Sequence, residues 1–221
     1  MEKIMKKKII SAIEEHKIIA IIRGVPREKL VDLAKALYEG GIRLLELTYS
    51  ADGSVSDEDT AKGIETLVNE LGDRMFIGAG TVLTVEQVSL TAKAGGSFII
   101  SPNVDEDVIS ATVKLGLVSM PGALTPTEIC QADKYGADFV KLFPISDLGS
   151  GYVKAVKSPL SHVKLLAVGG ITDENMGEYL GAGVCGFGIG SSLTDKKMIA
   201  ECDWDGITAL AEKYVAVMNN G

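Results

Sequence analysis

The sequence predicts a single domain over residues 1–221, a (β/α)8 (TIM) barrel with an N-terminal helix. Eight apolar, strand-like runs alternate with amphipathic helical stretches along the whole chain, as in a parallel sheet covered by helices. Eight such units fit a closed barrel better than an open, doubly wound sheet. The open fold usually carries G-x-G-x-x-G after its first strand, and "RGVPRE" does not match that pattern.

The elements follow one another regularly. The first is an amphipathic helix in "MEKIMKKKIISAIEEHK", with Ile4, Ile9, Ile10 and Ile13 on one side. Its apolar stretch is too short and too charged for a secretory signal. Strands are predicted at 18–23, 42–48, 75–80, 97–101, 117–120, 138–143, 163–168 and 184–190. Helical patterns lie between them, for example at 27–41, 85–96 and 172–184, and several end in glycine, the preferred helix stop.

Composition limits the possible partners. The formal net charge of −8 argues against a nucleic-acid or general membrane partner, and no apolar run has transmembrane length. Cys130, Cys185 and Cys202 lack CxxC spacing and are interpreted as reduced thiols, so we expect a cytoplasmic protein. His16 and His162 do not form a metal-binding pattern, and we predict neither a metal nor a cofactor.

A lysine and a glutamate interrupt two apolar strands near their ends. Lys141 lies inside "DFVKLFP", and Pro144 closes that strand, so we expect Lys141 near the C-terminal mouth of the barrel. Glu46 lies inside "LLELT" in the same way. Burial lowers the pKa of a lysine and raises that of a carboxyl group. A neutral amine beside a proton-shuttling carboxyl group is the minimal set for Schiff-base catalysis.

Two structural interpretations compete with this one. Lys141 can extend past a helix to water, and Glu46 can be its ion-pair partner without any chemistry. The catalytic interpretation is favoured because both faces of a barrel strand are apolar, which leaves Lys141 no route to solvent except at the mouth.

The ends of other strands add candidate binding residues. Arg23 ends the first strand, where a guanidinium can bind a carboxylate or phosphate, although a helix cap or an inter-subunit ion pair explains it about as well. Thr81 follows "GAG" after the third strand and is equally natural as a helix N-cap. The last two strands are followed by "AVGGIT" and "GIGSS". These loops commonly form a phosphate site in barrels, here with Gly169, Gly170, Gly190 and Ser191.

The chain resembles the 2-keto-3-deoxy-6-phosphogluconate (KDPG) / 4-hydroxy-2-oxoglutarate (KHG) aldolase family of class I aldolases. The resemblance runs from about Lys17 to Leu193. The matching stretches are "HKIIAIIRG", "GGIRLLELT", "IGAGTVL", "FIISPN", "MPGALTPTE", "VKLFP", "AVGGIT" and "GIGSSL", in the order and spacing of the family.

The resemblance implies a role for each candidate. Lys141 would form the Schiff base and Glu46 would be the general acid and base. Thr81 would hold the carboxylate of the substrate, and Arg23 and Pro102 would line the site. Gly170 and Ser191 would belong to the phosphate end. The family uses no metal and commonly assembles as a homotrimer.

Two positions depart from many members. The arginine that often follows the glutamate by four residues is Ser50 here, and the threonine before the glycine pair is Val168, as in members acting on the galactonate epimer (KDPGal). We expect reversible cleavage of KDPG or KDPGal to pyruvate and glyceraldehyde 3-phosphate, and also of 4-hydroxy-2-oxoglutarate to pyruvate and glyoxylate. The alternatives are another phosphate-barrel enzyme or a sugar-phosphate-binding barrel without turnover, which Ser50 supports.

Overall fold

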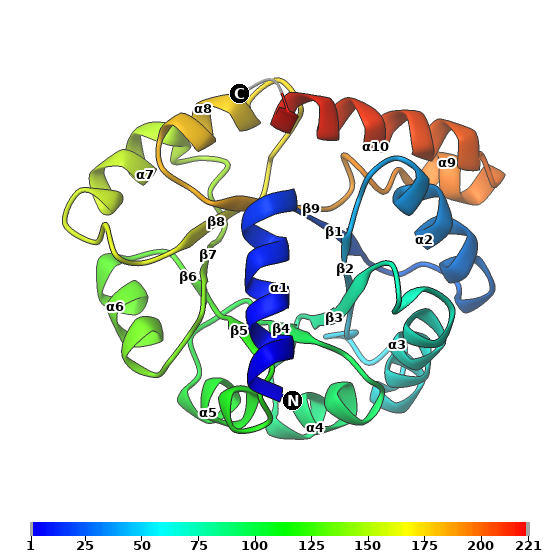
Figure 1. The fold of residues 1–221 in the computed structure, drawn as a ribbon, viewed down its shortest axis with the longest axis horizontal. Coiled ribbons are helices and arrows are strands. Elements are labelled where there is room, and N and C mark those ends of the chain that lie inside the picture. The colour runs from blue at the N-terminus through cyan, green and yellow to red at the C-terminus, as the bar shows by residue number, and fades with distance from the viewer. Residues whose placement is uncertain (1, 220–221) are drawn as a thin grey trace.

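A computed structural model describes residues 2–219, in which parallel strands surround a central axis and helices cover the outside (Figure 1). The strands are β1 (Ile18–Ile22), β2 (Leu44–Thr48), β3 (Phe76–Gly80), β4 (Phe98–Ile100), β5 (Val118–Met120), β6 (Gly122–Ala123), β7 (Val140–Leu142), β8 (Leu165–Val168) and β9 (Gly186–Ile189). The helices are α1 (Glu2–His16), η1 (Arg27–Lys29), α2 (Leu30–Glu39), α3 (Asp57–Leu71), α4 (Val85–Lys93), α5 (Glu106–Lys114), α6 (Pro126–Lys134), α7 (Gly149–Lys157), α8 (Met176–Gly181), α9 (Lys196–Glu201) and α10 (Trp204–Asn219).

The predicted (β/α)8 barrel is confirmed, with its fifth strand divided in two. The strand order is β5-β4-β3-β2-β1-β9-β8-β7-β6, and every pair is parallel. β5 pairs with β4 at one end of this order, and β6 pairs with β7 at the other. Only Pro121 separates β5 from β6. Because proline has no N–H for a ladder, it interrupts the strand at the point where the barrel closes.

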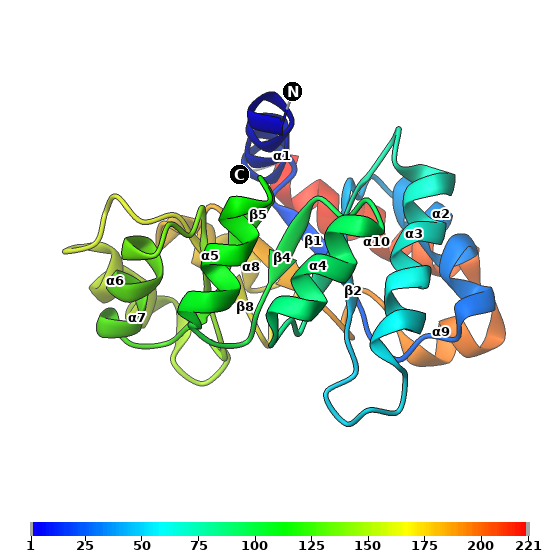
Figure 2. The same cartoon turned by 90° about the horizontal axis from the view of Figure 1, so that it is seen from below.

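Helix α1 crosses the N-terminal ends of the strands and covers that end of the barrel (Figures 1 and 2). Ile9 and Ile13 are buried against the residues that fill the barrel interior, as the amphipathic pattern predicted. The prediction was wrong for Ile4, whose side chain is 65% exposed because it lies beyond the edge of this contact. An ion pair of 2.8 Å between Lys6 and Asp138 fixes the helix to the barrel.

The predicted elements are confirmed in type and order, with some ends unchanged and the others shortened by one to four residues. The stretch at 27–41 begins as the 3-10 turn η1 and continues as α2, and the stretch at 172–184 keeps helical form only in α8. Five of the predicted glycine stops, Gly41, Gly95, Gly116, Gly136 and Gly183, have positive φ, the conformation that ends helices most easily. Cys130, Cys185 and Cys202 are free thiols, as predicted.

The loops after the strands gather at the end of the barrel opposite α1. Figure 2 shows the connection from β2 to α3 projecting from that end, on the far side of the strands from α1. The helix layer packs against one continuous apolar cluster, while a second cluster fills the barrel interior below the loops. Side chains at the upper ends of the strands are therefore the ones that can meet a ligand.

Candidate active site

Lys141 on β7 and Glu46 on β2 both lie inside the barrel. Their side chains are 6% and 1% exposed. Successive residues of a strand face opposite sides, and the flanking Val140 and Leu142 belong to the cluster under the helices. Lys141 therefore shares the interior side of β7 with Phe139. The predicted burial is confirmed, and the interpretation in which Lys141 extends to solvent is wrong.

Burial sets the proton affinities of both groups. It lowers the pKa of Lys141 from 10.5, and the opposing effect of the Glu46 charge is smaller. It likewise raises the pKa of Glu46 from 4.5, against smaller effects of Lys141 and Arg23. Within residues 2–219, the ammonium of Lys141 makes no direct ion pair with Glu46. The two groups are close enough to influence each other's charge, and each is held towards its neutral form.

The carboxyl group of Glu46 rests on the backbone of β3. A Cβ added at Gly80 would lie 1.5 Å from Oε1 of Glu46, so only glycine leaves room for this side-chain position. The other oxygen, Oε2, is buried and has no hydrogen-bond partner among the described protein atoms. Because an unpaired buried polar atom is costly, this oxygen is well suited to accept a proton from a ligand or to donate one to it.

Replacement of Gly80 by alanine should displace Glu46 and lower kcat by at least roughly tenfold, because a small misplacement of a catalytic group is costly. The free energy of unfolding should fall by about 1–3 kcal/mol from overpacking. Gly177→Ala is the matched control: its added Cβ meets no heavy atom within 4 Å. Denaturant titration and steady-state kinetics on both variants check this, and wild-type kinetics for Gly80→Ala would contradict it.

Arg23 and Thr81 form a pair across the mouth of the barrel. The Nη2 atom of Arg23 donates a hydrogen bond of 3.1 Å to Oγ1 of Thr81. Thr81 is not the helix cap, because Thr84 caps α4 by accepting from the N–H of Gln87. Thr81 has φ of +56°, and a β-branched residue in this region stores about 1–3 kcal/mol of strain, which proteins often keep at functional sites.

Phe143 lies beside the amine of Lys141, and Pro102 lies beside the register partner of Lys141. Lys141 pairs in register with Gly122, whose Cα faces the carbonyl of Pro102 so closely that an added Cβ would lie 2.4 Å from its oxygen. The Nζ atom of Lys141 lies 4.5 Å above the centre of the Phe143 ring. This contact places an aromatic face over the amine, and Phe143 is 36% exposed, enough to meet a ligand.

The glycine pair after β8 forms a loop held by one side chain. Gly169 and Gly170 have φ of +101° and +68°. The Nδ2 atom of Asn175 donates to the carbonyl of Gly170 over 2.8 Å, and its Oδ1 accepts from the N–H of Thr172 over 2.9 Å. The N–H of Gly170 donates to no acceptor within residues 2–219, so it is free to bind an anion.

The loop after β9 is fixed by hydrogen bonds of Ser192 and Thr194, close to Ser191. The hydroxyl of Ser192 donates to the carbonyl of Ile171 over 2.9 Å. The hydroxyl of Thr194 lies 3.1 Å from the carbonyl oxygens of both Ile21 and Gly190. Ser191 itself is exposed, and its hydroxyl has no partner in the described part of the chain. The two predicted phosphate loops are thus adjacent and fixed, with unpaired donors at their tips.

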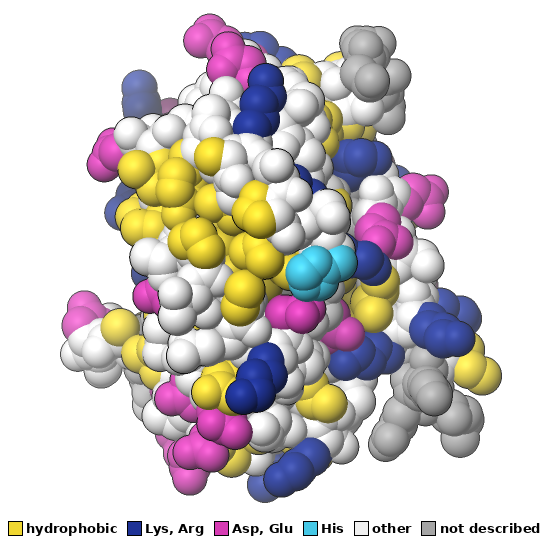
Figure 3. Space-filling model, turned by 90° about the vertical axis from the view of Figure 1, so that its left-hand side faces the viewer, with side chains coloured by type: hydrophobic (Ala, Val, Ile, Leu, Met, Phe, Trp, Pro, Cys, Tyr) yellow, Lys and Arg dark blue, Asp and Glu magenta, His cyan; other side chains and the backbone are white. Residues whose placement is uncertain are grey.

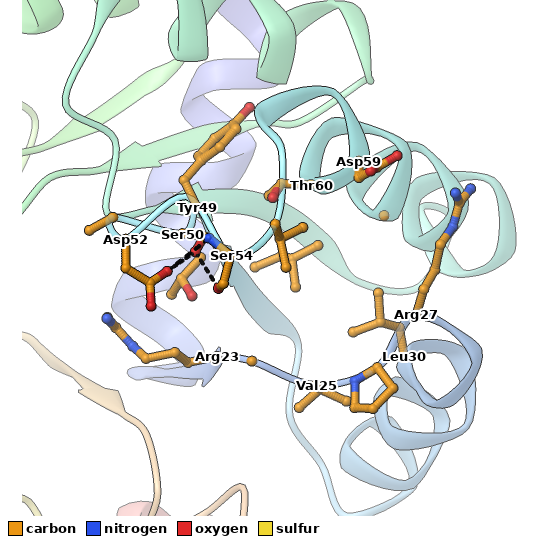
Figure 4. A pocket seen from close by; sticks show the side chains of 17 residues that line it. Arg23, Val25, Arg27, Leu30, Tyr49, Ser50, Asp52, Ser54, Asp59 and Thr60 are labelled. Carbon is orange, nitrogen blue, oxygen red and sulfur yellow. Dashed lines mark hydrogen bonds between the residues drawn. The ribbon is translucent and has the colours of Figure 1, made fainter.

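Ser50 does not take the place of the missing arginine. Its hydroxyl donates to Oδ1 of Asp52 over 2.5 Å and lies 2.8 Å from the hydroxyl of Ser54. Figure 4 draws both hydrogen bonds as dashed lines. The hydrogen bond from Ser50, together with those from the N–H and the hydroxyl of Ser54, lowers the pKa of Asp52 to about 2. The loop after β2 therefore presents a carboxylate rather than a cation, and Arg23 is the cation opposite it in the same view.

Two cavities meet at Arg23. One, of about 630 Å³, lies under the loop after β2, and the other, of about 510 Å³, reaches the loop after β9. Neither is lined by Lys141 or Glu46, which lie deeper in the barrel. The two cavities are therefore separate from the buried pair, which lies inside the barrel.

Sequence reasoning missed Gly80, Phe143 and Asn175. Gly80 makes room for the carboxyl group of Glu46, Phe143 covers the amine of Lys141, and Asn175 shapes the glycine loop. The only sequence signal was their position next to predicted site residues, because each role depends on the direction in which a side chain points or on a contact between segments.

Comparison with known proteins agrees with this geometry. A family profile described as "KDPG and KHG aldolase" matches residues 9–210. The chain belongs to the KDPG and KHG aldolase family. It is 38% identical over 187 residues to a probable 2-dehydro-3-deoxy-6-phosphogalactonate aldolase of Rhizobium meliloti, which covers 84% of this chain and 85% of the relative.

Two further aldolases of this family are similar over almost their whole length. The 2-dehydro-3-deoxy-phosphogluconate aldolase of Treponema pallidum is 32% identical over 214 residues, covering 95% of this chain and 97% of that one. The KDPG aldolase of Legionella pneumophila superimposes with a TM-score of 0.83 at 30% identity, covering 92% and 96% of the two chains. Its crystal structure holds pyruvate as a covalent carbinolamine intermediate.

Between residues 2 and 219, the side chains of His, Cys, Asp and Glu nowhere form a group of three that could hold a metal ion. In the same range, each helix is either too short or too polar to cross a bilayer.

Proposed function

We propose that this aldolase works through a Schiff base on Lys141. It would reversibly cleave KDPG or KDPGal to pyruvate and glyceraldehyde 3-phosphate, and also 4-hydroxy-2-oxoglutarate to pyruvate and glyoxylate. The observation that carries the proposal is the buried pair of Lys141 and Glu46, each shifted towards its neutral form. The carbinolamine in the Legionella relative supports the same chemistry for this chain.

The cleavage follows from the two groups. The neutral amine of Lys141 attacks the C2 ketone, and Glu46, acting through a water, moves the protons that convert the carbinolamine to an iminium ion. Glu46 then takes the proton of the C4 hydroxyl group. The C3–C4 bond breaks, its electrons pass into the iminium to form an enamine, and the aldehyde leaves. Protonation of the enamine at C3 and hydrolysis release pyruvate and free Lys141.

Arg23 and Thr81 take the carboxylate in this proposal. Arg23 supplies a cation at the mouth where Ser50 supplies none, and its hydrogen bond to Thr81 fixes its direction. Pro102 would line the site as well, since its carbonyl lies beside Gly122, the register partner of Lys141. A charge-assisted, paired carboxylate contact contributes binding and orientation together.

Arg23→Gln is expected to raise KM for pyruvate about 10- to 100-fold in the aldol direction, the loss of one hydrogen bond to a charged group. The positive charge of Arg23 also lowers the pKa of Lys141. Without that charge the pKa of Lys141 should rise, so the variant should need a higher pH for Schiff-base formation. Arg27→Gln is the control, because Arg27 contacts Thr66 on α3 and not Thr81. Equal pyruvate KM values in the two variants would count against the assignment.

The phosphate end is assigned to Gly169, Gly170, Gly190 and Ser191. Both loops offer unpaired donors, and Val168, directly before the glycine pair, is buried against Gly188 of β9. Val168 offers a methyl group where a threonine would offer a hydroxyl, so it makes no hydrogen bond to a substrate hydroxyl. Relatives named for each epimer support both substrates.

The testing experiment combines two assays on the wild-type protein. Cleavage of KDPG, KDPGal and 4-hydroxy-2-oxoglutarate is followed through pyruvate release, and the protein is reduced with borohydride in the presence of pyruvate and mapped by mass spectrometry. We expect turnover and a reduced pyruvate adduct on Lys141. Affinity for the phosphosugar acids without turnover or adduct would favour the binding barrel instead.

We also propose that residues 1–221 form one domain, that the protein is a homotrimer and that it works in the cytoplasm. The family resemblance supports the trimer. Figure 3 supports it too, because hydrophobic side chains gather in a patch on the face that carries α6 and α7. Sedimentation equilibrium tests the trimer directly.

A further inference from the structure

The cavity of about 510 Å³ lies between two segments from opposite ends of the chain. One wall is the stretch after β1, with Arg23 and Lys29, and the other is the stretch after β9, with Gly190, Ser191 and Lys196. Figure 1 shows α9 beside the segment that joins β1 to α2. The cavity therefore continues outward from the loop assigned to the phosphate end.

The charges around this cavity are all of one sign. Three cationic side chains line it, and no carboxylate does. The cavity under the loop after β2 is different, because its two arginines are balanced by Asp52 and Asp59. In a chain of net charge −8, a concave surface lined only by cations concentrates positive potential and attracts anions.

Lys29 and Arg23 already have partners within the protein. The ammonium of Lys29 donates to the carbonyls of Ile199 and Ala200, each over 2.9 Å, and ties the two walls together. Arg23 donates to Thr81, towards the carboxylate end. These two contacts hold the shape of the cavity and leave one cation to be explained.

Lys196 is that cation. Its side chain is exposed, and its ammonium has no hydrogen bond or ion pair with residues 2–219. The adjacent carboxylate of Asp195 is turned away, since its Oδ1 accepts from the N–H groups of Lys197 and Met198 over 2.9 Å each. Lys196, whose ammonium is unpaired, thus lines the same cavity as Ser191, whose hydroxyl is also unpaired.

We propose that Lys196 is a specificity-determining residue that binds the phosphate dianion of the aldehyde half of the substrate, next to Ser191. This inference rests on the proposed function and adds a side-chain charge to a site otherwise made of backbone N–H groups and a hydroxyl. As a consequence, the enzyme should distinguish between aldehyde substrates. The cation favours glyceraldehyde 3-phosphate over glyoxylate, because glyoxylate has no phosphate group to bind it.

The test compares Lys196→Gln with Lys197→Gln, an exposed neighbour that does not line the cavity. In the aldol direction with pyruvate, the ratio of kcat/KM for glyceraldehyde 3-phosphate to that for glyoxylate should fall about 5- to 20-fold in Lys196→Gln, mainly through KM. Lys197→Gln should keep the wild-type ratio. An unchanged ratio in Lys196→Gln, or an equal fall in both variants, would overturn the proposal.

A second measurement does not depend on turnover. Binding of inorganic phosphate is measured by calorimetry for the wild type and both variants at two salt concentrations. Lys196→Gln should weaken phosphate binding and reduce its salt dependence, because one cation fewer is neutralised. If the wild type cleaves none of the substrates but Lys196→Gln alone loses phosphate affinity, the anion site stands while the aldolase assignment fails. Equal phosphate affinity in all three proteins would refute the site.

Discussion

Replacement of Lys141 by methionine should abolish turnover, lowering kcat by roughly 10⁴-fold or more, as expected when a covalent nucleophile is removed. Methionine fills the space of the stem and removes only the amine. The variant should also lose the borohydride-dependent pyruvate adduct. Steady-state kinetics and intact mass measure the two effects on the same preparation.

The control for this variant is Lys154→Met, on the exposed surface of α7. It should retain activity and the adduct. Circular dichroism should show a native fold for Lys141→Met, because the barrel interior tolerates an apolar residue better than an ammonium group. Retained turnover in a folded Lys141→Met protein would eliminate the Schiff-base mechanism.

The pH dependence of trapping tests the buried environment of Lys141 directly. Burial lowers its pKa from 10.5, so the neutral, reactive amine persists to lower pH than in an ordinary lysine. The rate of adduct formation should rise with pH and level off below 10.5. A rate that keeps rising through 10.5 would mean that Lys141 is solvated like a surface lysine.

Glu46→Gln should lower kcat by about 10²- to 10⁴-fold, the usual contribution of a general acid and base. Glutamine keeps the shape of the side chain but cannot exchange a proton. The adduct on Lys141 should still form, only more slowly, which separates this variant from Lys141→Met. Because the charge of Glu46 raises the pKa of Lys141, its removal should move the trapping midpoint to lower pH.

Stability measurements on Glu46→Gln guard against misfolding as the explanation. Burial raises the pKa of Glu46 above 4.5, so the folded protein binds more protons than the unfolded chain between these two pKa values. The stability of the wild type therefore falls as pH rises through that window. Glutamine does not ionise, so the variant lacks this loss. Its free energy of unfolding should therefore rise relative to that of the wild type as the pH approaches neutral. The exposed Glu86→Gln should show neither effect.

The sequence alone determined the barrel and the two charged residues buried inside it. Strand and helix periodicities are local, so alternating apolar runs and glycine stops are enough to predict the order of elements. Lys141 and Glu46 were found for the same reason, since a charge inside an apolar strand must be buried wherever that strand packs. The two glycine loops followed from their positions after the last strands.

Only the tertiary structure decided how these parts meet. Pro121 divides the fifth strand where the sheet closes, Ile4 lies outside the contact made by α1, and Thr84 rather than Thr81 caps α4. The bond between Arg23 and Thr81 joins residues 58 positions apart. The placement of Lys196 on the same cavity as Arg23 is likewise invisible in the sequence. Closure of the barrel brings distant strand ends to one mouth, and local patterns carry no information about which loop side chains then face each other.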